Sequence, residues 1–194
     1  MKKLLILIAS PPACGNTRLA KKLSLALGNV VYLDKDALIP LSKRVFAVAK
    51  KPYNRSSAFF NRNVRDYEYQ VILGLGYDAM RYGDTVIINA PFTREVRDKE
   101  YIKSLADRAE NCGGELLVVW INADEETCYK RMKKRNSDRD KWKLSHWSEY
   151  VKTIDFSSPV NAVGRRLFEY DNRDDDKAEK CFEQLLQKIE SLRN

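Results

Sequence analysis

Ser10 to Thr17 carry the clearest chemical pattern in this sequence, because their types and spacing approach those of a phosphate-binding loop. Such a loop reads G-x-x-x-x-G-K-[ST] between a strand and a helix, and the segment here reads SPPACGNT. Gly15 lets the chain turn, the backbone amides of residues 13–18 would point at phosphate, and Thr17 would offer its hydroxyl to Mg²⁺. The residues that we expect around the phosphates are Ser10, Pro12, Ala13, Cys14, Gly15, Asn16, Thr17 and Arg18.

Two positions of this segment depart from the pattern. Ser10 stands where the first glycine is usual, and Asn16 stands where the lysine is usual. Lysine supplies a positive charge to the β- and γ-phosphates, whereas asparagine supplies only a neutral amide donor. The segment alone therefore fits either a phosphate site or an ordinary turn between a strand and a helix.

Polar side chains also follow two other apolar segments. Asp34 and Asp36 come just after residues 30–33, and Asn89 lies near the end of residues 85–90. Ligands of open α/β sheets bind beyond the carboxyl ends of the strands. There a carboxylate can accept the proton of a substrate hydroxyl, and an amide oxygen can hold Mg²⁺ or its water. An aspartate after a strand can instead cap a helix.

Arginines could bind the charged groups of a substrate or of a transferred phosphoryl group. Residues 130–143 hold eight basic and two acidic side chains on a nearly balanced background. Arg131 and Arg135 share one helical face because they are four residues apart, and Arg139 follows in the same segment. Arginines stabilise the charge that builds on the equatorial oxygens during phosphoryl transfer. Arg94 either reaches the substrate or is a solvated charge at a helix start.

The same basic segment is compatible with a nucleic-acid interface. Trp142, Trp147 and Tyr150 lie within or just after it, and bases stack on aromatic side chains. The two tryptophans would equally pack a lid onto the core. Nucleic-acid binders usually spread their charge along a groove or stripe, whereas here it is concentrated in one segment. This concentration favours a phosphate-binding lid over a nucleic-acid interface.

Apolar runs and helical periodicities alternate along the chain, and continuous apolar runs are typical of parallel strands covered on both faces. We expect strands at residues 4–9, 30–33, 85–90, 115–122 and 166–170. We expect helices at residues 17–27, 56–82, 94–111, 124–135 and 174–192, and a short one at 145–152 within an irregular segment, 136–165. The alternation predicts an α/β fold with an open, mostly parallel five-stranded sheet and helices on both faces.

Composition limits the class of protein. The 194 residues suit one domain, and a net charge of +8 suits an anionic partner. No apolar run approaches the roughly 18 residues of a transmembrane helix, and the run at residues 4–9 is shorter than the apolar region of an export signal. The four cysteines form no CxxC pair and no zinc spacing, which indicates reduced thiols in a cytoplasmic protein without a structural metal.

The sequence contains five blocks at predicted strand ends, in the order PPACGNTRLAKKL, VYLDKDAL, INAPFTRE, RMKKRNSDRDKWKL and FEYDN. Together they resemble P-loop kinases of the zeta-toxin and chloramphenicol-phosphotransferase type. They resemble more closely the bacterial proteins known as AAA-family ATPases or P-loop ATP-binding proteins. The resemblance covers nearly the whole chain. It implies a P-loop NTPase fold like that of nucleoside-monophosphate kinases, as one domain over residues 1–194 with a basic lid at about 130–150.

This resemblance implies ATP-dependent, Mg²⁺-assisted transfer of a phosphoryl group to the hydroxyl of a small molecule, which it does not identify. It implies that Asp36 is the base, that Asp34 orients substrate or a magnesium-bound water, and that Asn89 lies on the magnesium side. It implies that Asp171 and Asn172 lie beside the adenine ring. The arginines of the basic segment would then act on the phosphates.

Three interpretations remain open. The one that we favour is an active small-molecule kinase, acting as a monomer or a homodimer. The second is a nucleotide-binding protein whose catalysis is impaired because Asn16 replaces the loop lysine. The third is a nucleic-acid-binding module that uses residues 130–143.

Overall fold

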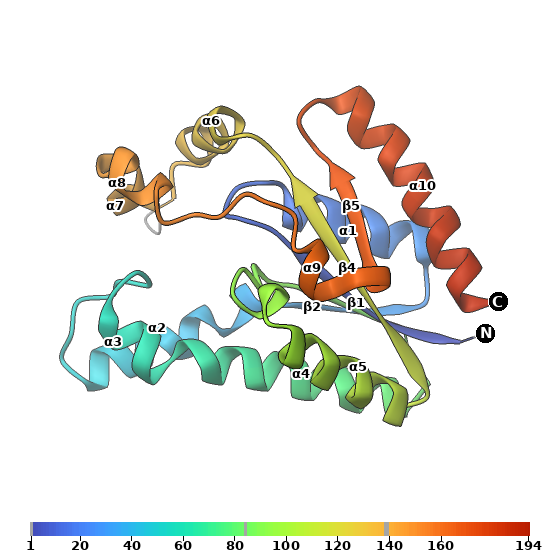
Figure 1. Cartoon of the computed structure of the whole chain (residues 1–194). Coiled ribbons are helices and arrows are strands. Elements are labelled where there is room, and N and C mark those ends of the chain that lie inside the picture. The colour runs from blue at the N-terminus through green and yellow to red at the C-terminus, as the bar shows by residue number, and fades with distance from the viewer. Residues whose placement is uncertain (1, 84, 138–139) are drawn as a thin grey trace.

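A five-stranded sheet forms the centre of the protein, for which a computed structural model describes residues 2–83, 85–137 and 140–194 (Figure 1). The strand order is β2-β3-β1-β4-β5, and every pair of neighbouring strands is parallel. The strands are β1 (Lys3–Ala9), β2 (Val30–Asp34), β3 (Thr85–Asn89), β4 (Gly114–Asn122) and β5 (Leu167–Asp171). The predicted open parallel sheet is thus confirmed, and each strand boundary agrees to within one residue.

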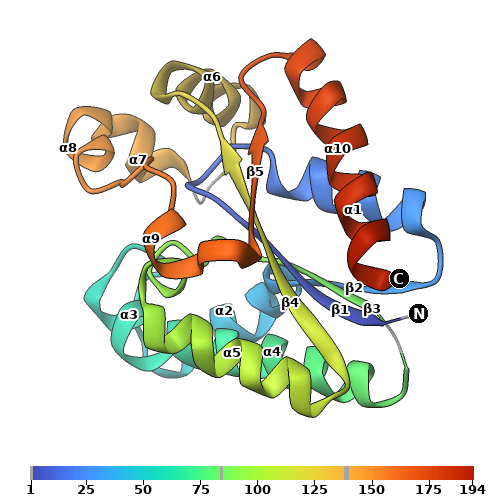
Figure 2. The same ribbon diagram turned by 45° about the vertical axis from the view of Figure 1, so that its right-hand side comes forward.

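Helices cover both faces of this sheet, as the sequence predicts (Figure 2). The helices are α1 (Asn16–Leu27), α2 (Ile39–Val48), α3 (Ala58–Asn63), α4 (Arg65–Arg81), α5 (Lys99–Asn111), α6 (Glu125–Arg135), α7 (Lys141–Ser145), α8 (Trp147–Val151), α9 (Val160–Val163) and α10 (Asp175–Arg193). Successive residues of β1 face opposite sides. Leu5 and Leu7 pack with α4 and α5, whereas Leu4 and Ile6 pack with α1 and α10. The continuous apolar run of β1 therefore supplies two cores.

The helix predicted over residues 56–82 is two helices, α3 and α4. Val64 interrupts it, with φ −133° and ψ −46°. Gly74 and Gly76 lie within α4 and do not interrupt it. A Cβ added to Gly76 would lie 2.9 Å from Ile88 Cδ1, so this glycine lets α4 approach β3 closely.

Three further segments differ from their predictions. The helix predicted from Arg94 begins only at Lys99, because the Asp98 side chain accepts hydrogen bonds from two amides of the first turn of α5. Residues 136–165 contain α7, α8 and α9 rather than one short helix in an irregular segment. Neither α2 nor the 3₁₀ turn Lys35–Leu38 that leads into it was predicted from the sequence.

Two groups of helices lie at the end of the molecule where the strands have their carboxyl termini. One group is α2 and α3, and the other is α6, α7 and α8 (Figures 1 and 2). In the sheet register Asn89 of β3 pairs with Ile8 of β1 and with Asp34 of β2. Polar strand ends therefore meet at one edge. No helix in the described ranges is both long and apolar enough to cross a membrane.

Candidate functional site

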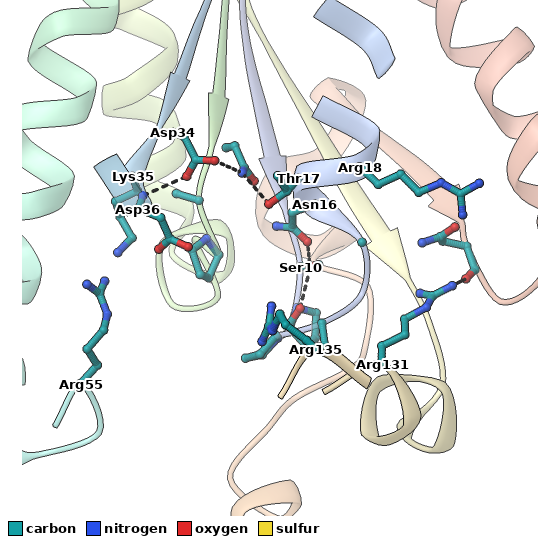
Figure 3. Close-up of a pocket in the computed structure, with 18 of the residues that line it drawn as sticks. Ser10, Asn16, Thr17, Arg18, Asp34, Lys35, Asp36, Arg55, Arg131 and Arg135 are labelled. Atoms are coloured by element: carbon teal, nitrogen blue, oxygen red, sulfur yellow. Dashed lines mark hydrogen bonds between the residues drawn. The ribbon is translucent and has the colours of Figure 1, made fainter. Parts of the chain in front are cut away.

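A cavity of about 370 Å³ lies at the carboxyl edge of the sheet (Figure 3). The loop after β1 forms one wall, the residues after β2 form a second, and α6 contributes side chains to a third. Its lining includes Ser10, Pro11, Pro12, Ala13, Gly15, Asn16, Thr17, Arg18, Asp34, Lys35, Asp36, Arg55, Asn89, Ala90, Pro91, Arg131, Arg135, Lys143 and Asn172. Most of the side chains singled out from the sequence meet in this cavity.

The loop between β1 and α1 is held from two directions. Gly15 precedes α1 with φ +111°, a conformation that glycine adopts at little cost. The carbonyl oxygen of Cys14 accepts hydrogen bonds from Asn172 Nδ2 at 2.6 Å and from Arg131 Nη1 at 3.1 Å. Arg131 also donates to the carbonyl oxygen of Asn172 at 3.0 Å. Residues from α6 and from the segment after β5 thus fix the path of the loop.

Asn16 uses its side chain within the loop itself. Its Oδ1 accepts a hydrogen bond from the fully buried Ser10 hydroxyl, and its Nδ2 donates to the carbonyl oxygen of Ile8 at 3.3 Å. The carboxamide therefore connects the first turn of α1 to the end of β1. The asparagine at the position of the usual lysine supports the loop but brings no positive charge to it.

Thr17, Asn89 and Asp34 form one hydrogen-bonded group across three elements (Figure 3). Asn89 Nδ2 lies 3.1 Å from Thr17 Oγ1 and 2.9 Å from Asp34 Oδ2. The Tyr32 hydroxyl donates to the same Asp34 oxygen at 2.7 Å. Burial and this carboxylate raise the pKa of Tyr32, so the phenol remains a hydrogen-bond donor. The sequence identified all three residues; the sheet register pairs Asp34 with Asn89, and the first turn of α1 brings Thr17 to them.

Asp34 and Asp36 have different surroundings although they are two residues apart. Asp34 caps the 3₁₀ turn that follows β2, because its Oδ1 accepts from the Asp36 amide at 2.9 Å. Its other oxygen accepts from Tyr32 and Asn89. Both carboxylates line the cavity. The capping interpretation of this aspartate pair is therefore correct for Asp34, whose two oxygens already receive hydrogen bonds.

A buried group of charges forms the wall beside Asp36, and the sequence analysis missed it. Glu68 accepts from Lys35 Nζ at 2.7 Å and from the two Nη atoms of Arg55 at 3.0 and 2.7 Å. Burial lowers the pKa of Lys35. Burial alone would raise the pKa of Glu68, but Lys35 and the other donors hold it below its usual value. Glu68 thereby fixes two cationic side chains on the cavity wall.

The basic segment contributes two of its predicted arginines to the cavity. Arg131 binds the loop as described, and Arg135 binds the fully buried Asp140 through Nε at 2.8 Å and Nη2 at 2.6 Å. Arg139 lies outside the described residues. Lys143 also lines the cavity, which the sequence analysis did not anticipate.

Other residues singled out from the sequence lie elsewhere. Arg94 is exposed and is absent from the described cavity lining. Asp171 bonds Arg173 rather than facing the cavity, while its neighbour Asn172 does line it. Arg18 lines the cavity edge and pairs with Asp175 at 3.2 Å. Cys14 turns its buried side chain away from the cavity, toward α6.

The tryptophans of the basic segment make contacts within the protein. Trp147 packs against Tyr129 of α6, and its Nε1 donates to Glu125 at 3.1 Å. Trp142 stacks on His146 and keeps 44% of its surface exposed. Trp147 thus joins α8 to α6.

Comparison with known proteins identifies the family. The sequence profile of the AAA domain matches residues 5–156, and no curated protein matches the chain. The fold is similar to a candidate kinase from Chloroflexus aurantiacus j-10-fl, with a TM-score of 0.68, 18% identity and 100% of both chains covered. It is also similar to a gluconokinase from Sinorhizobium meliloti 1021, with a TM-score of 0.59, 14% identity, and 98% of this chain and 97% of that one covered.

A third similar structure is the APS kinase of Mycobacterium tuberculosis in complex with AMPPNP and APS. Its TM-score is 0.58 at 16% identity, with 97% of this chain and 98% of that one covered. At such identities the similarity establishes the fold. The profile spans well over half of the sequence, and the kinase structures match over nearly its whole length. The chain therefore belongs to the AAA domain family and has the fold of a P-loop kinase.

Proposed function

We propose that this protein binds ATP with Mg²⁺ in the cavity and transfers the γ-phosphoryl group to a hydroxyl of a small molecule. The observation that carries the proposal is that one cavity joins the loop of residues 10–17 to the carboxylates Asp34 and Asp36. A kinase needs both parts within reach of each other, because it positions a phosphoryl donor against an acceptor and stabilises charge between them. ATP supplies the transferred phosphoryl group.

The donor side of the cavity has the chemistry of a phosphate site. Gly15 lies at the N-terminal end of α1, where backbone amides and the helix dipole favour anions. Arg131 brings a positive charge to the same cavity, and Arg135 lines it while paired with Asp140. Arg131 offsets in part the charge that Asn16 does not supply. In this proposal Ser10, Pro12, Ala13 and Asn172 complete the nucleotide side.

The group formed by Thr17, Asn89 and Asp34 fits Mg²⁺. It offers the Thr17 hydroxyl and the Asp34 carboxylate, whose oxygens are the hard ligands that this ion prefers, while Asn89 directs its Nδ2 donor at both. Within the described ranges, no three His, Cys, Asp or Glu side chains gather as a metal site. Magnesium in kinases typically takes one or two carboxylates together with phosphate oxygens and waters. We therefore assign the ion to Thr17, with Asp34 holding one of its waters; Asn89 would join as a ligand by turning its carboxamide so that Oδ1 faces the ion.

The acceptor would lie on the side of Asp36, where the 3₁₀ turn and Arg55 line the cavity. Asp36 would accept the proton of the attacking hydroxyl. We propose that the whole chain acts as one kinase domain whose lid, at about residues 130–150, closes over the phosphates. The engagement of Arg131 with the loop supports phosphate over nucleic acid as the partner of this segment. A cytoplasmic location and a monomeric or homodimeric state complete the proposal.

Titration with Mg-ATP tests the first step. We expect saturable binding by calorimetry and a rise in melting temperature, because a ligand at 100 times its Kd stabilises a fold by about 2.7 kcal/mol. Arg131→Ala should weaken binding about tenfold or more, since it removes a charge next to the loop. Lys130→Ala is the matched control, because Lys130 is exposed and pairs with Glu126. Folded protein that binds no nucleotide at millimolar Mg-ATP contradicts the proposal.

A second candidate function is a nucleotide sensor with impaired catalysis. The observation that favours it is the Asn16 side chain, which is occupied by Ser10 and Ile8 and carries no charge. Such a protein would bind ATP yet transfer its phosphoryl group slowly or not at all. Restoring the lysine separates the two functions.

We expect Asn16→Lys to tighten ATP binding by about ten- to a hundredfold. A charge-assisted hydrogen bond to phosphate contributes about 1.5 to 3 kcal/mol, and each 1.4 kcal/mol is about tenfold in affinity. Asn16→Ala is the control, because it loses the bonds to Ser10 and Ile8 without adding a charge. ATP affinity and ATPase rate are measured on all three proteins. If the protein is a sensor, ATP turnover appears only in the lysine variant. If it is a kinase, the wild-type protein already turns over ATP. Equal ATP affinity in wild type and Asn16→Lys means either that this loop does not hold phosphate or that another cation, such as Arg131, already supplies the missing charge.

A further inference from the structure

Cys14 and Cys128 meet beneath the nucleotide loop although 114 residues separate them in sequence. Their sulfur atoms are 3.3 Å apart, and both side chains are fully buried. Cys14 belongs to the loop, and Cys128 belongs to α6, the helix that carries Arg131 and Arg135. The contact therefore joins the two parts of the protein that would hold the phosphates from opposite sides.

We propose that Cys14 and Cys128 form a redox-active pair, which a peroxide converts to a disulfide that ties the loop to α6. A disulfide bond is about 2.05 Å long, so the sulfurs need only a small further approach. The reaction of the thiols rests on their geometry alone. Its consequence for nucleotide binding rests on the function proposed above.

Cys128 is the sulfur that reacts first. Its contact with Cys14, with help from the Arg131 charge, holds the pKa of the Cys128 thiol below its usual value despite burial and the opposing charge of Asp124. The contact with Cys128 and burial raise the pKa of Cys14. Because the thiolate is the nucleophile in thiol oxidation, and because Cys128 lies on the helix that also carries the Arg131 charge, we take Cys128 as the attacking group and Cys14 as the resolving one.

The reaction needs only the two thiols and the peroxide. The Cys128 thiolate attacks one peroxide oxygen, the O–O bond breaks, and Cys128 becomes a sulfenic acid as hydroxide leaves. Cys14 then attacks the Cys128 sulfur, the S–O bond breaks, and the departing hydroxide takes up the Cys14 proton to form water. The two thiols lose two electrons and two protons in all, and one peroxide molecule becomes two waters.

The weak packing of α6 allows a small oxidant to reach Cys128. Of the residues of α6, only Cys128 and Met132 are buried. A helix held by so few apolar side chains opens locally at low cost compared with global unfolding. Opening of this kind exposes Cys128 without disturbing the sheet. By contrast, Cys112 packs with the core on the other face of the sheet.

The disulfide would alter the nucleotide site directly. The Cys14 carbonyl oxygen is the atom that accepts from Arg131 and Asn172, so a shift of Cys14 toward α6 changes the path of the loop. The bond also fixes α6, which a closing lid must move. We expect Mg-ATP affinity to fall about tenfold on oxidation, as the loss of one hydrogen bond to phosphate would produce.

Peptide mapping by mass spectrometry tests the pairing. The protein is treated with hydrogen peroxide, free thiols are alkylated, and the digest is compared before and after reduction. We expect a reducible cross-link between the peptides of Cys14 and Cys128. The double variant Cys112→Ser/Cys181→Ser should keep this link, and Cys14→Ser and Cys128→Ser should each lose it. Melting curves confirm that each variant is folded. Free or over-oxidised Cys14 and Cys128 peptides, or a link to another cysteine, overturn the pairing.

Calorimetry on the Cys112→Ser/Cys181→Ser protein tests the consequence. Mg-ATP is titrated into the reduced form, the peroxide-treated form and the form reduced again. Reversible loss of affinity supports control of the nucleotide site by the disulfide, and equal affinity in the linked and reduced forms overturns it. Absence of binding in every form, together with an intact cross-link in the mass spectrum, identifies a failure of the proposed nucleotide function rather than of the thiol pair.

Discussion

Replacement of Asp36 by asparagine should slow phosphoryl transfer by about 10² to 10⁴, which is the usual contribution of a general base. The substitution keeps the size of the side chain but removes the carboxylate that would accept the proton of the acceptor hydroxyl. Affinity for Mg-ATP should stay nearly unchanged, because in the proposed arrangement Asp36 faces the acceptor. Transfer of labelled γ-phosphate to a panel of small hydroxyl compounds measures the rate, and calorimetry measures nucleotide binding.

Asp34→Asn provides the matched comparison and has a different expected result. Asp34 accepts from the Asp36 amide, from Tyr32 and from Asn89, and the asparagine side chain offers only one acceptor atom. We therefore expect Asp34→Asn to lower the melting temperature. Full transfer activity in Asp36→Asn, with loss of activity in a folded Asp34→Asn protein, would assign the base to Asp34 instead.

The sheet could be predicted from the sequence because each strand corresponds to a short apolar run that can be recognised locally. Residues 4–9 are apolar without interruption, and such a run is typical of a strand buried on both faces. Turn and polar residues then follow the strand ends, and parallel pairing brings these ends to one edge of the sheet. The adjacent positions of Asp34 and Asn89 in the register follow from that pairing. The loop residues of the cavity lining and the pair of Asp34 and Asn89 could thus be identified from local sequence patterns, whereas Asn172 was implied only by the family resemblance.

The cavity wall beside Asp36 could not be predicted in the same way, because it depends on contacts between distant residues. Lys35 and Glu68 are 33 residues apart, and Arg55 and Glu68 are 13 apart. No periodicity or motif links them. Lys35 lies between Asp34 and Asp36, which were both predicted as site residues. The sequence did not indicate that Lys35 itself is buried on the cavity wall. A buried Glu68 within a helix gives no signal in the sequence until its two cationic partners are known.

Helix boundaries were also predicted imprecisely. The cause here is local, because a neighbouring residue can be the better cap. Arg94 follows a strand and precedes a helical pattern, so the sequence assigned it to the start of that helix. Asp98 is the better cap, because its side chain accepts from two amides of the first turn. Arg94 consequently lies in an exposed turn before the helix, apart from the described cavity lining. The turn after Asp34 was not predicted for the same reason: Asp34 acts as the cap of a short 3₁₀ segment.

Gly15→Ala should reduce Mg-ATP affinity by about 30-fold or more. At φ +111° an alanine is strained, by about 1 to 2 kcal/mol for a left-handed backbone. Its Cβ would also come closer than 3.0 Å to Asn172 Nδ2, a distance that real Cβ atoms do not show. Asn172 would have to move, and the buried bond to the Cys14 carbonyl oxygen would break, which costs about 1 to 3 kcal/mol. Together these effects destabilise the binding-competent loop conformation by about 2 to 5 kcal/mol. Each 1.4 kcal/mol corresponds to about a tenfold change in affinity.

Gly28→Ala is a control that separates the effect of the steric clash at Gly15 from the effect of backbone strain. Gly28 also has a positive φ, +72°, but a Cβ there would meet nothing within 4 Å. This control should therefore lose some stability and keep its nucleotide affinity, because Gly28 ends α1 far along the helix from the loop. Calorimetry with Mg-ATP and thermal unfolding are run on wild type and both variants. If Gly15→Ala binds Mg-ATP as tightly as Gly28→Ala, the loop at Gly15 does not hold the phosphates, and the nucleotide site must lie elsewhere in the cavity.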